Sequence, residues 1–449
     1  MRKIIFLAYA APLLAQNATP AGDSLSLRQA VQLALRENKA IAATRAGTQA
    51  AVSQIDEARS GRLPKVNYSE SFVRSNNPVF VFSSLLTQHQ FGPENFNIGP
   101  LNRPDSINNF QSVLSVDQTL FDAGQTRNAV KSADLSRQVS VEEERRIRMQ
   151  VISGVVRAYY GAVLAAESLK TAEQAQRSAA ADLERAQSVH AAGMSTDVDV
   201  LSIRVHLAAV TEQRIQRAAD LEVATSALND ALGLPLDTVH ILTSALAPAP
   251  LPEGELASLE HDASQARPEA RAARLAADVA RTQADTAHSA LLPQVAFHAA
   301  FEADRQQFIN KGGANWLASI GLRWNLFDGN GDKARIREAG FFEERAQADE
   351  HRVDSAVKLE VRRAWAGLRA AAQRIEVAKA AVVEAEESLR ITQNRYQAGM
   401  SNVTDLLRNE TAVLESRTRY LAAVHDDRIA AVMLELAAGR LSPDSEVLN

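Results

Sequence analysis

The sequence predicts a mixed, mainly α-helical fold in which two similar halves each contain a long helical hairpin and a pair of β-strands. Three observations support this prediction. Short motifs recur at a constant offset of 206 residues. Proline is absent from Asp105 to Leu234 and from Gln294 to Ser442, as long uninterrupted helices require. Finally, 14 of the 23 aromatic residues fall in two short segments, between Pro64 and Asp122 and between Leu291 and Asp328.

The composition excludes several classes of protein. The 449 residues carry a formal net charge of -5, so a surface for nucleic acid is not expected. The absence of cysteine excludes disulfides, thiolate metal sites, a cysteine nucleophile and a lipidated N-terminal cysteine.

The N-terminus has the order of a secretory signal. Arg2 and Lys3 precede an apolar run from Ile4 to Ala15, which small residues follow. We expect a signal peptide over residues 1–18, with the cleavage position left open; the alternative is a buried N-terminal helix. No later stretch approaches eighteen consecutive apolar residues, so we expect no transmembrane helix. A membrane location would then require strands.

The halves are defined by repeated motifs. At the offset of 206 residues, "AAGMST" (Ala191–Thr196) matches "QAGMSN" (Gln397–Asn402), and "LFDAG" (Leu120–Gly124) matches "LFDGN" (Leu326–Asn330). Further upstream the offset is 229, so the first half contains 23 extra residues, rich in Asn, Gly and Pro. We therefore expect a first repeat at 24–236 with an enlarged loop at 74–109, a linker at 237–255, a second repeat at 256–441 and a tail at 442–449.

Each repeat begins with an amphipathic segment and continues into a hairpin. In the first, a helix from Gln125 to Ala191 spans 67 residues, roughly 100 Å at the rise of an α-helix. A returning helix runs from about Asp197 to Leu232, and its seven-residue apolar spacing favours coiled-coil packing. The shorter segment from Ser26 to Gly61 predicts another helix. The matching helices of the second repeat are Leu256–Ala290 and Thr404–Ala438.

Two strands are expected in each repeat, because apolar and polar residues alternate there. Aromatic residues on alternating positions suit a lipid-facing barrel, although an ordinary sheet packed on its own core is the alternative. Four strands are too few to close a barrel, since about eight is the practical minimum. Three copies would supply twelve. The alternating apolar positions are Val66, Tyr68 and Phe72; Phe110, Leu114, Val116 and Leu120; Val295, Phe297 and Phe301; and Trp316, Ala318, Ile320, Leu322, Trp324 and Leu326.

From about Leu25 to Gly439 the chain resembles the TolC family of outer-membrane efflux proteins. The resemblance rests on the duplication, the two "LFD" junctions, "RPE" at Arg267–Glu269 and the tips "AAGMSTDVDVL" and "YQAGMSNVTDLL". The first half has "NKA" at Asn38–Ala40 in place of "RPE", without the proline.

The resemblance implies an architecture and a function. It implies duplicated helical hairpins that form an α-helical barrel in the periplasm, with four β-strands per chain contributing to a trimeric, 12-stranded transmembrane β-barrel. The function would be that of a passive exit duct of a tripartite efflux or type I secretion system. Its expected partners are two further copies of the chain, a periplasmic adaptor, an inner-membrane pump and outer-membrane lipid, with no nucleic acid, cofactor or metal. The cargo is left open.

The resemblance also assigns adaptor docking to the tips. In the family, a small residue, glycine and an apolar residue form the docking motif, with a threonine downstream. Gly193 and Met194 match this motif in the first half, and Gly399, Met400 and Thr404 match it in the second. Val198 stands at the threonine position of the first half. The alternative is simple turn chemistry, because a sharp helical hairpin favours glycine.

A periplasmic gate is the second role that the resemblance implies. Asp199, Tyr396 and Asp405 match positions of the closed tip and its acidic constriction, while Arg408 replaces a second acidic residue. Three converging Asp405 carboxylates would raise one another's pKa values and attract cations.

The alternative role of the two aspartates is helix capping, by Thr196 with Asp199 and by Asn402 with Asp405. Ser401 replaces an arginine of some relatives, which leaves the details of the gate lock open. Arg408 could pair with an aspartate instead.

Two other classes of protein are alternatives to an export channel. An enzyme is disfavoured because the sequence has no phosphate-binding glycine loop, no HExxH motif and no nucleophile elbow. "DGNGD" at Asp328–Asp332 begins like a calcium loop, but Ala339 stands where a bidentate acid is needed, so a turn is expected. A periplasmic coiled-coil adaptor or scaffold without a pore would explain the helices but leave the aromatic strands without a role.

Overall fold

A computed structural model describes residues 23–249, 255–309 and 312–448, so the expected signal peptide lies outside the described residues. The chain forms two compact units: the first contains residues 1–41, 148–263 and 360–449, and the second contains residues 42–147 and 264–359. Each unit therefore draws on both halves of the sequence. The limits of the two repeats stay a prediction.

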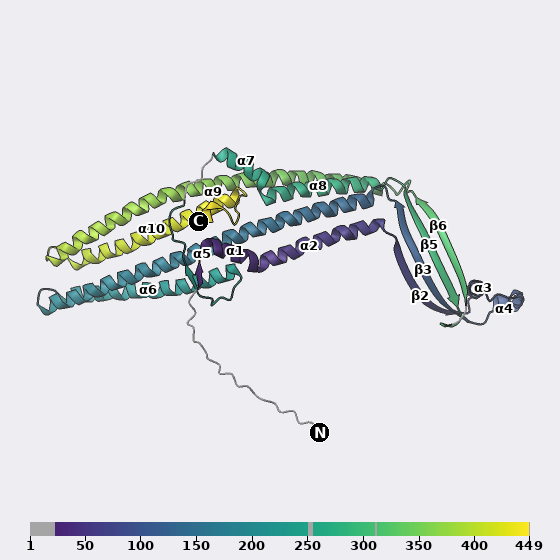
Figure 1. The fold of residues 1–449 in the computed structure, drawn as a ribbon, viewed down its shortest axis with the longest axis horizontal. Helices are drawn as coiled ribbons and strands as arrows, with labels where there is room; N and C mark the ends of the chain where they lie inside the picture. Colours follow the sequence, from purple (N-terminus) through teal and green to yellow (C-terminus); the bar gives the residue numbers. More distant parts are fainter. Residues whose placement is uncertain (1–22, 250–254, 310–311, 449) are drawn as a thin grey trace, which may run out of the picture. The chain divides into compact units, whose positions relative to one another are not determined.

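Both helical hairpins form as expected (Figure 1). Helix α5 (Gln125–Ala191) and helix α6 (Asp197–Leu232) have the bounds that the sequence predicts. The second hairpin consists of α9 (Gly331–Gln397) and α10 (Val403–Ala437). The 67 residues of α5 and of α9 confirm that proline-free sequence rich in strong helix formers continues without a break.

The shorter segment before each hairpin is broken, and the expectation of one helix in each place is wrong. The first segment forms α1 (Leu27–Glu37) and α2 (Lys39–Arg59), because Asn38 between them is extended. The side-chain Nδ2 of Asn38 donates to Ala231 O at 3.1 Å, and its Oδ1 accepts from Ala40 N at 2.9 Å. The second segment forms α7 (Leu256–Ala266) and α8 (Pro268–Ser289). Pro268 forces this break, because the residue before a proline avoids the helical region.

Three other segments carry more structure than the sequence predicts. The enlarged loop contains α3 (Pro78–Thr87), a 3-10 turn at Pro93–Phe96 and α4 (Ile98–Asn102). The linker contains β4 (His240–Leu242), which pairs in parallel with β1 (Asp23–Leu25). The described chain therefore has six strands, not four. The expected tail ends in a 3-10 turn that buries Leu448.

The core of the first unit is centred on Tyr159 of α5, whose side chain is fully buried. Its hydroxyl donates to Leu25 O at 2.8 Å and accepts from the amides of Thr243 and Ser244 at 3.1 and 2.9 Å. One side chain thus binds both strands of the β1–β4 pair to the helix. Around it lie buried residues of α1, α5, α6 and α10 and of the C-terminal segment, including Leu27, Val31, Val155, Val156, Leu228, Leu232, Val432 and Leu441.

We expect Tyr159→Phe to loosen this unit by about 1–3 kcal/mol, because the Ser244 amide would lose its buried partner, while the Thr243 amide and the Leu25 carbonyl would keep only their bond to each other at 3.2 Å. The measurement is hydrogen exchange at Thr243 and Ser244, which we expect to become roughly tenfold faster or more. Tyr160→Phe is the matched control: Tyr160 is equally buried, and its hydroxyl has no hydrogen bond in the part of the chain that the structure describes. Equal effects of the two variants would contradict the role assigned to the Tyr159 hydroxyl.

The second unit contains a four-stranded antiparallel sheet with the order β2–β3–β5–β6. Its strands are β2 (Lys65–Ser75), β3 (Ile107–Phe121), β5 (Gln294–Arg305) and β6 (Gly313–Arg323). All four therefore fall where apolar and polar residues alternate in the sequence. Within the described chain, β2 and β6 each have one edge without a partner strand.

The two faces of this sheet differ in chemistry. The register aligns Tyr68, Leu114, Phe301 and Trp316 in one row across all four strands, and their exposed fractions range from 46% to 80%. We call this side the apolar face. The opposite side, the polar face, carries rows such as Lys65, Asp117, His298 and Ser319. Near the end of the strands away from the helices, this apolar face also carries Glu70 and Arg305, which pair with each other at 2.8 Å. Large apolar side chains that stay exposed in a row across all four strands need an apolar environment.

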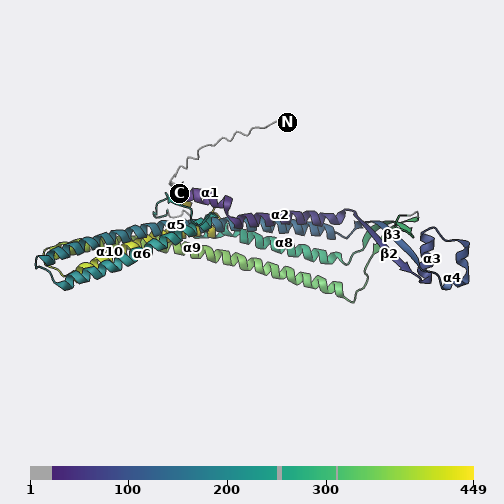
Figure 2. The ribbon, with the colours of Figure 1, turned by 90° about the horizontal axis from the view of Figure 1, so that it is seen from below.

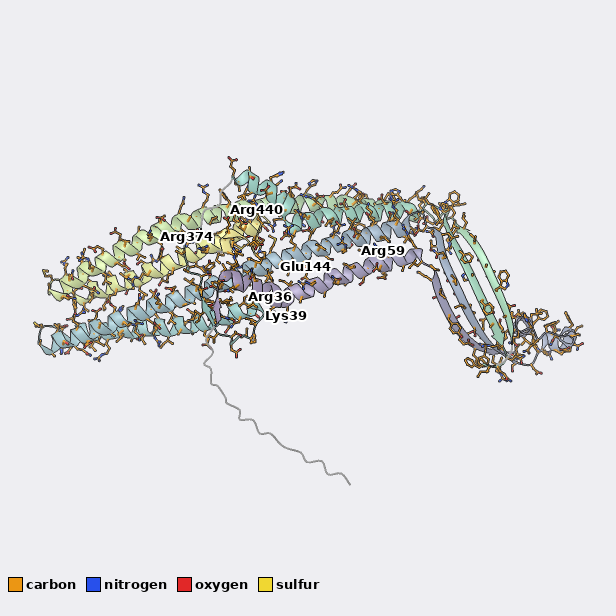
Figure 3. All side chains as sticks on the ribbon, viewed as in Figure 1. Arg36, Lys39, Arg59, Glu144, Arg374 and Arg440 are labelled. Carbon is orange, nitrogen blue, oxygen red and sulfur yellow. The ribbon has the colours of Figure 1, made fainter. Side chains whose placement is uncertain are left out.

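The helices of the second unit run beside one another and join the sheet through the "LFD" motifs (Figures 1 and 2). Thr48 of α2 donates to the carboxylate of Glu144 in α5, which Figure 3 labels, at 3.3 Å. At the junctions, Asp122 accepts from the amide of Thr126 at 2.7 Å and Asp328 accepts from the amide of Asp332 at 2.7 Å. Each aspartate therefore stabilises the start of a long helix. The segment Asp328–Asp332 forms a turn before α9, as expected.

One described helix, α5, contains an 18-residue segment that could cross a membrane by length and composition, and 44% of that segment is buried inside the protein. The buried residues of α5 from Met149 to Val163 belong to the core around Tyr159. Core packing accounts for their apolar character. The expectation of no such segment was too strict, because it counted only consecutive apolar residues.

Candidate functional site

The two tips, residues 191–199 and 397–405, close with the same turn. Gly193 and Gly399 have φ angles of +75° and +71°, in the left-handed region that favours glycine. The amide after each glycine donates to the carbonyl five residues earlier: Met194 N donates to Val189 O at 3.1 Å, and Met400 N donates to Arg395 O at 2.8 Å. This is the Schellman arrangement at a helix C-terminus. The repeated motif therefore encodes one backbone turn, made twice.

The turns leave apolar side chains in solvent. Met194 is 73% exposed, Met400 is 64% exposed, and Val198 is 68% exposed. Thr404 is also exposed. Turn chemistry explains the glycines, but it does not explain exposed methionines, which are typical of adaptable contact surfaces.

Asp199 is engaged in helix capping. Its carboxylate accepts from Thr196 N at 3.1 Å and from the Ser195 hydroxyl at 3.0 Å, while Asp199 N donates to Thr196 Oγ1 at 3.3 Å. The amide of Thr196, followed by the two hydroxyls, holds the pKa of Asp199 below its usual value, against the opposing effect of burial. The first tip thus has a complete capping box, and Asp199 is an ionised, fixed carboxylate.

Asp405 is capped on one side only. Its amide donates to Asn402 Oδ1 at 2.9 Å, but the described residues show no return bond from its carboxylate to Asn402 N. The carboxylate accepts only from the Ser401 hydroxyl at 3.4 Å. Arg408 lines the same hollow as Asp405, yet it forms no ion pair within the described chain. The expected pair between Arg408 and an aspartate is therefore not found among the described residues.

Tyr396 joins the two hairpins just above the tips. It packs against a cluster formed by Ala186 of α5, Ile203 of α6 and Val403 of α10. Burial, followed by the negative charges of Asp199 and Asp182, raises the pKa of Tyr396. The ring therefore lies in the contact between the hairpins, where a gate residue would be needed.

Sequence reasoning missed a buried acidic pair in the same region. Asp182 of α5 and Glu410 of α10 are 5% and 8% exposed and face each other between the hairpins. Their oxygens Asp182 Oδ2 and Glu410 Oε2 have no hydrogen-bond partner among the described groups. A proton shared between these two oxygens would satisfy both. The offset of 228 residues between the pair differs from the repeat offset, so no sequence signal was available.

Four neighbours complete the cluster. Arg185 pairs with Asp182 at 2.8 Å, and Ser178 donates to Glu410 Oε1 at 3.3 Å. His206 Nε2 of α6 lies 3.1 Å from Glu410 Oε2, without the alignment of a hydrogen bond. Tyr396 of α9 is close enough for its pKa to respond to Asp182. All four helices of the two hairpins therefore contribute to this cluster.

The two carboxyls titrate in opposite directions. Burial, together with the Glu410 carboxylate, raises the pKa of Asp182 to about 7. Burial opposes ionisation of Glu410 as well, but His206 and Asp182 outweigh it and lower the pKa of Glu410. Below about pH 7 the pair therefore holds one proton, which the contact between the two carboxyls retains.

We expect Asp182→Asn to stabilise the contact between the hairpins and to remove its pH dependence. The unfolded chain ionises Asp182 above about pH 4, whereas the folded chain keeps the proton until about pH 7, so stability falls as pH rises through this window. Asn cannot ionise, and we expect a gain of about 1–3 kcal/mol at neutral pH. Hydrogen exchange of α5 and α10 near the tips, measured at several pH values, gives the test.

The control is Glu184→Gln, because Glu184 lies two residues from Asp182 on α5, with an exposed side chain that has no ion pair among the described residues. We expect it to leave the pH profile unchanged. A pH profile of Asp182→Asn that follows the unsubstituted chain would contradict the shared proton.

Comparison with known proteins identifies the family. The profile of the outer membrane efflux protein family matches residues 30–234 and 259–440, which is most of the chain. The chain belongs to the outer membrane efflux protein family. The expected resemblance is therefore confirmed.

Individual proteins of known sequence or structure agree with this family. CyaE of Bordetella pertussis is 28% identical over 447 residues, which cover 97% of this chain and 89% of the relative. The alkaline protease secretion protein AprF of Pseudomonas aeruginosa is 24% identical and covers 85% of this chain and 78% of its own. The crystal structure of the Campylobacter jejuni CmeC outer membrane channel superposes with a TM-score of 0.78 at 16% identity, covering 100% of this chain and 96% of that one. The last likeness concerns the fold.

Family membership confirms several expectations from the sequence. This outer membrane efflux protein is an export channel of the outer membrane and not an enzyme. It works as a homotrimer with a periplasmic adaptor and an inner-membrane pump. The scaffold without a pore is not favoured.

Proposed function

We propose that three copies of this chain close their sheets into one twelve-stranded barrel, with the free edge of β6 in one protomer paired to the free edge of β2 in the next. The observation that supports this proposal is the four-stranded sheet with one exposed apolar face and two edges without partners in the described chain. In hydrocarbon, unpaired backbone groups cost several kcal/mol each, and closure pairs them all. Rotational symmetry of three copies closes the ring.

In this arrangement the apolar face meets lipid and the polar face lines the channel. Asp117, His298 and Glu302 would then border a wet path for solutes. The chain supplies no energy for transport. Selection and energy come from the pump, and the channel conducts passively.

We assign adaptor docking to the exposed tips, with the second tip as the main contact. Gly399 fixes the turn, Met400 offers a soft apolar surface, and the exposed Thr404 adds a hydroxyl. Gly193 and Met194 form the matching surface of the first tip, although Val198 replaces the threonine there. Methionine is enriched at protein interfaces, which supports a role beyond the turn.

The gate is assigned chiefly to Asp405, because its carboxylate is only loosely held. Three copies of Asp405 on the axis would form an acidic ring, with Arg408 next to it and Tyr396 fixing the helix behind it. Asp199 contributes through the first tip, where capping holds its carboxylate in place. Adaptor contacts at the tips would then separate the hairpins and open the ring.

The cargo is determined by the pump and adaptor that join this channel. AprF is named for secretion of an alkaline protease, and the family is named for efflux. Both processes need the same open duct. Identification of the pump and adaptor that co-purify with the chain would distinguish small solutes from polypeptides.

We expect Leu114→Lys to prevent stable insertion, because Leu114 lies on the apolar face in the row that crosses all four strands. A lysine in the lipid-facing band of a barrel costs about 2–4 kcal/mol. The measurement is the amount of heat-modifiable trimer in the outer-membrane fraction. Ser115→Lys is the control, because the adjacent residue points to the polar face. Normal trimers of Leu114→Lys, or a folded and water-soluble monomer of the unsubstituted chain, would contradict the barrel.

We expect Asp405→Asn to reduce the preference of single channels for cations over anions by roughly twofold or more, because the ring would lose three negative charges. Planar-bilayer recordings of reversal potential in a salt gradient give the measurement. Asp197→Asn removes an exposed aspartate from the other tip and serves as the control. An unchanged reversal potential would remove Asp405 from the conduction path.

A further inference from the structure

The enlarged loop between β2 and β3, residues 76–106, has no role in the function proposed so far. We call it the outer loop. It lies at the end of the sheet where β2 ends at Ser75 and β3 begins at Ile107, which is the end away from the helix junctions. Figure 1 shows α3 and α4 at this end of the strands. The matching connection of the second half is much shorter, because β5 ends at Arg305 and β6 begins at Gly313.

A buried chain of amides attaches the outer loop to one face of the sheet. Gln88 Nε2 donates to Asn109 Oδ1 at 2.8 Å, and Asn109 Nδ2 donates to Asp304 Oδ1 at 2.6 Å. The exposed fractions of these three residues are 2%, 6% and 0%. Asp304 pairs with Gln111 in the register, so Asn109 and Asp304 both project from the polar face. The outer loop is therefore bound to the polar face.

Contacts with β6 give the same orientation independently. A Cβ atom added to Gly313 would lie 1.8 Å from the carbonyl oxygen of Thr87, at the end of α3. Gly313 pairs with Asp304, so this missing side chain also belongs to the polar face. Asn315, on the same face, donates to Thr87 O at 3.3 Å. Helix α3 thus begins just after β2 and ends against β6 on the polar side of the sheet, before the loop returns to β3.

Helix α3 has an unusual distribution of apolar residues. Val81, Ser84 and the following Gln88 are buried toward the sheet. Val79, Phe82 and Leu86, spaced three and four residues apart, form a stripe on another side of the helix. The ring of Phe82 packs against Phe91 of the same loop at 4.7 Å, but Val79 and Leu86 stay 77% and 48% exposed. An apolar stripe this exposed needs a cover.

We propose that the outer loops of three protomers fold inward as flaps over the outer mouth of the channel, and that the α3 stripes cover one another there. This inference rests on the trimeric barrel proposed above. In that barrel the polar face lines the lumen, so a loop bound to the polar face points toward the axis. Membrane lipid contacts the opposite face and cannot cover the stripe. Threefold symmetry brings the same stripe of two other copies to the axis, and these are the occupants that the geometry offers.

The flaps would make the outer mouth, as well as the helical tips, a barrier to passage. A ring of apolar side chains at a constriction excludes hydrated ions more strongly than the polar wall behind it. The anchor at Gln88 determines how far each flap can move aside.

Cross-linking tests the meeting of the flaps. The chain has no cysteine, so Val79→Cys or Leu86→Cys introduces a single thiol per protomer. We expect oxidation of outer-membrane trimers to give a covalent dimer on denaturing gels for both variants. Tyr68→Cys places a thiol on the apolar face, at 66% exposure in the single chain, and is expected to stay monomeric.

Conductance tests the barrier. We expect Gln88→Ala to free the flap and raise single-channel conductance by roughly twofold, since the width of a pore limits its current. This substitution lies outside the strands, so it spares the barrel. Gln90→Ala, at an exposed position of the same loop, is the control and should leave conductance unchanged.

The outcomes separate the flap from the barrel. Cross-linked dimers together with increased conductance support the flap. Intact heat-modifiable trimers without cross-links and with unchanged conductance would overturn it while leaving the barrel standing. Labelling of Val79→Cys by a photoreactive lipid would overturn it in favour of the membrane. Absence of trimers from the unsubstituted chain would overturn the barrel first and the flap with it.

Discussion

Backbone pairing in lipid is the constraint on which the rest of this structure depends. A four-stranded sheet has two rows of unpaired amide and carbonyl groups, and a hydrocarbon environment offers them no water. The apolar row of Tyr68, Leu114, Phe301 and Trp316 nevertheless commits one face to that environment. Self-association follows from these two facts, because only further copies supply identical edges. The helical hairpins then take the same symmetry as the sheet to which the "LFD" junctions connect them.

Duplication gives each protomer two tips with the same backbone turn, yet the side chains of the two tips differ. The first tip has a closed capping box that fixes Asp199, and the second leaves Asp405 without the return bond. A fixed carboxylate suits a structural role, whereas a loosely held one can respond to its surroundings. Behind the tips, the buried acids Asp182 and Glu410 face each other between the hairpins, and burial raises the pKa of Asp182 to about 7. In the proposed gate, the contact that separates on opening would therefore contain a buried acid that titrates near neutral pH.

Most of the architecture could be predicted from the sequence because it rests on local rules. Proline-free stretches gave the bounds of α5 and α6, and alternation located four strands. The failures occurred where tertiary contacts decide. Asn38 breaks a helix because its amide reaches Ala231 in a distant segment. Strands β1 and β4 are three residues long, and Tyr159 binds Leu25 of β1 and the two residues that follow β4, a contact that no period can reveal. The acidic pair and the inward anchor of the outer loop are likewise meetings of residues far apart in the chain.

The hydroxyl of Tyr159 also constrains the order of assembly. It joins Leu25, near the beginning of the chain, to Thr243 and Ser244, which follow more than 200 residues later. The core around it also needs Leu441 and Leu448, which come about 200 residues later again. Contacts of such long sequence separation form slowly, because the entropy of loop closure opposes them. The first unit cannot be completed while the polypeptide is still crossing the inner membrane. Newly delivered chains therefore keep the apolar segments of this core uncovered until residues 441–448 have joined it.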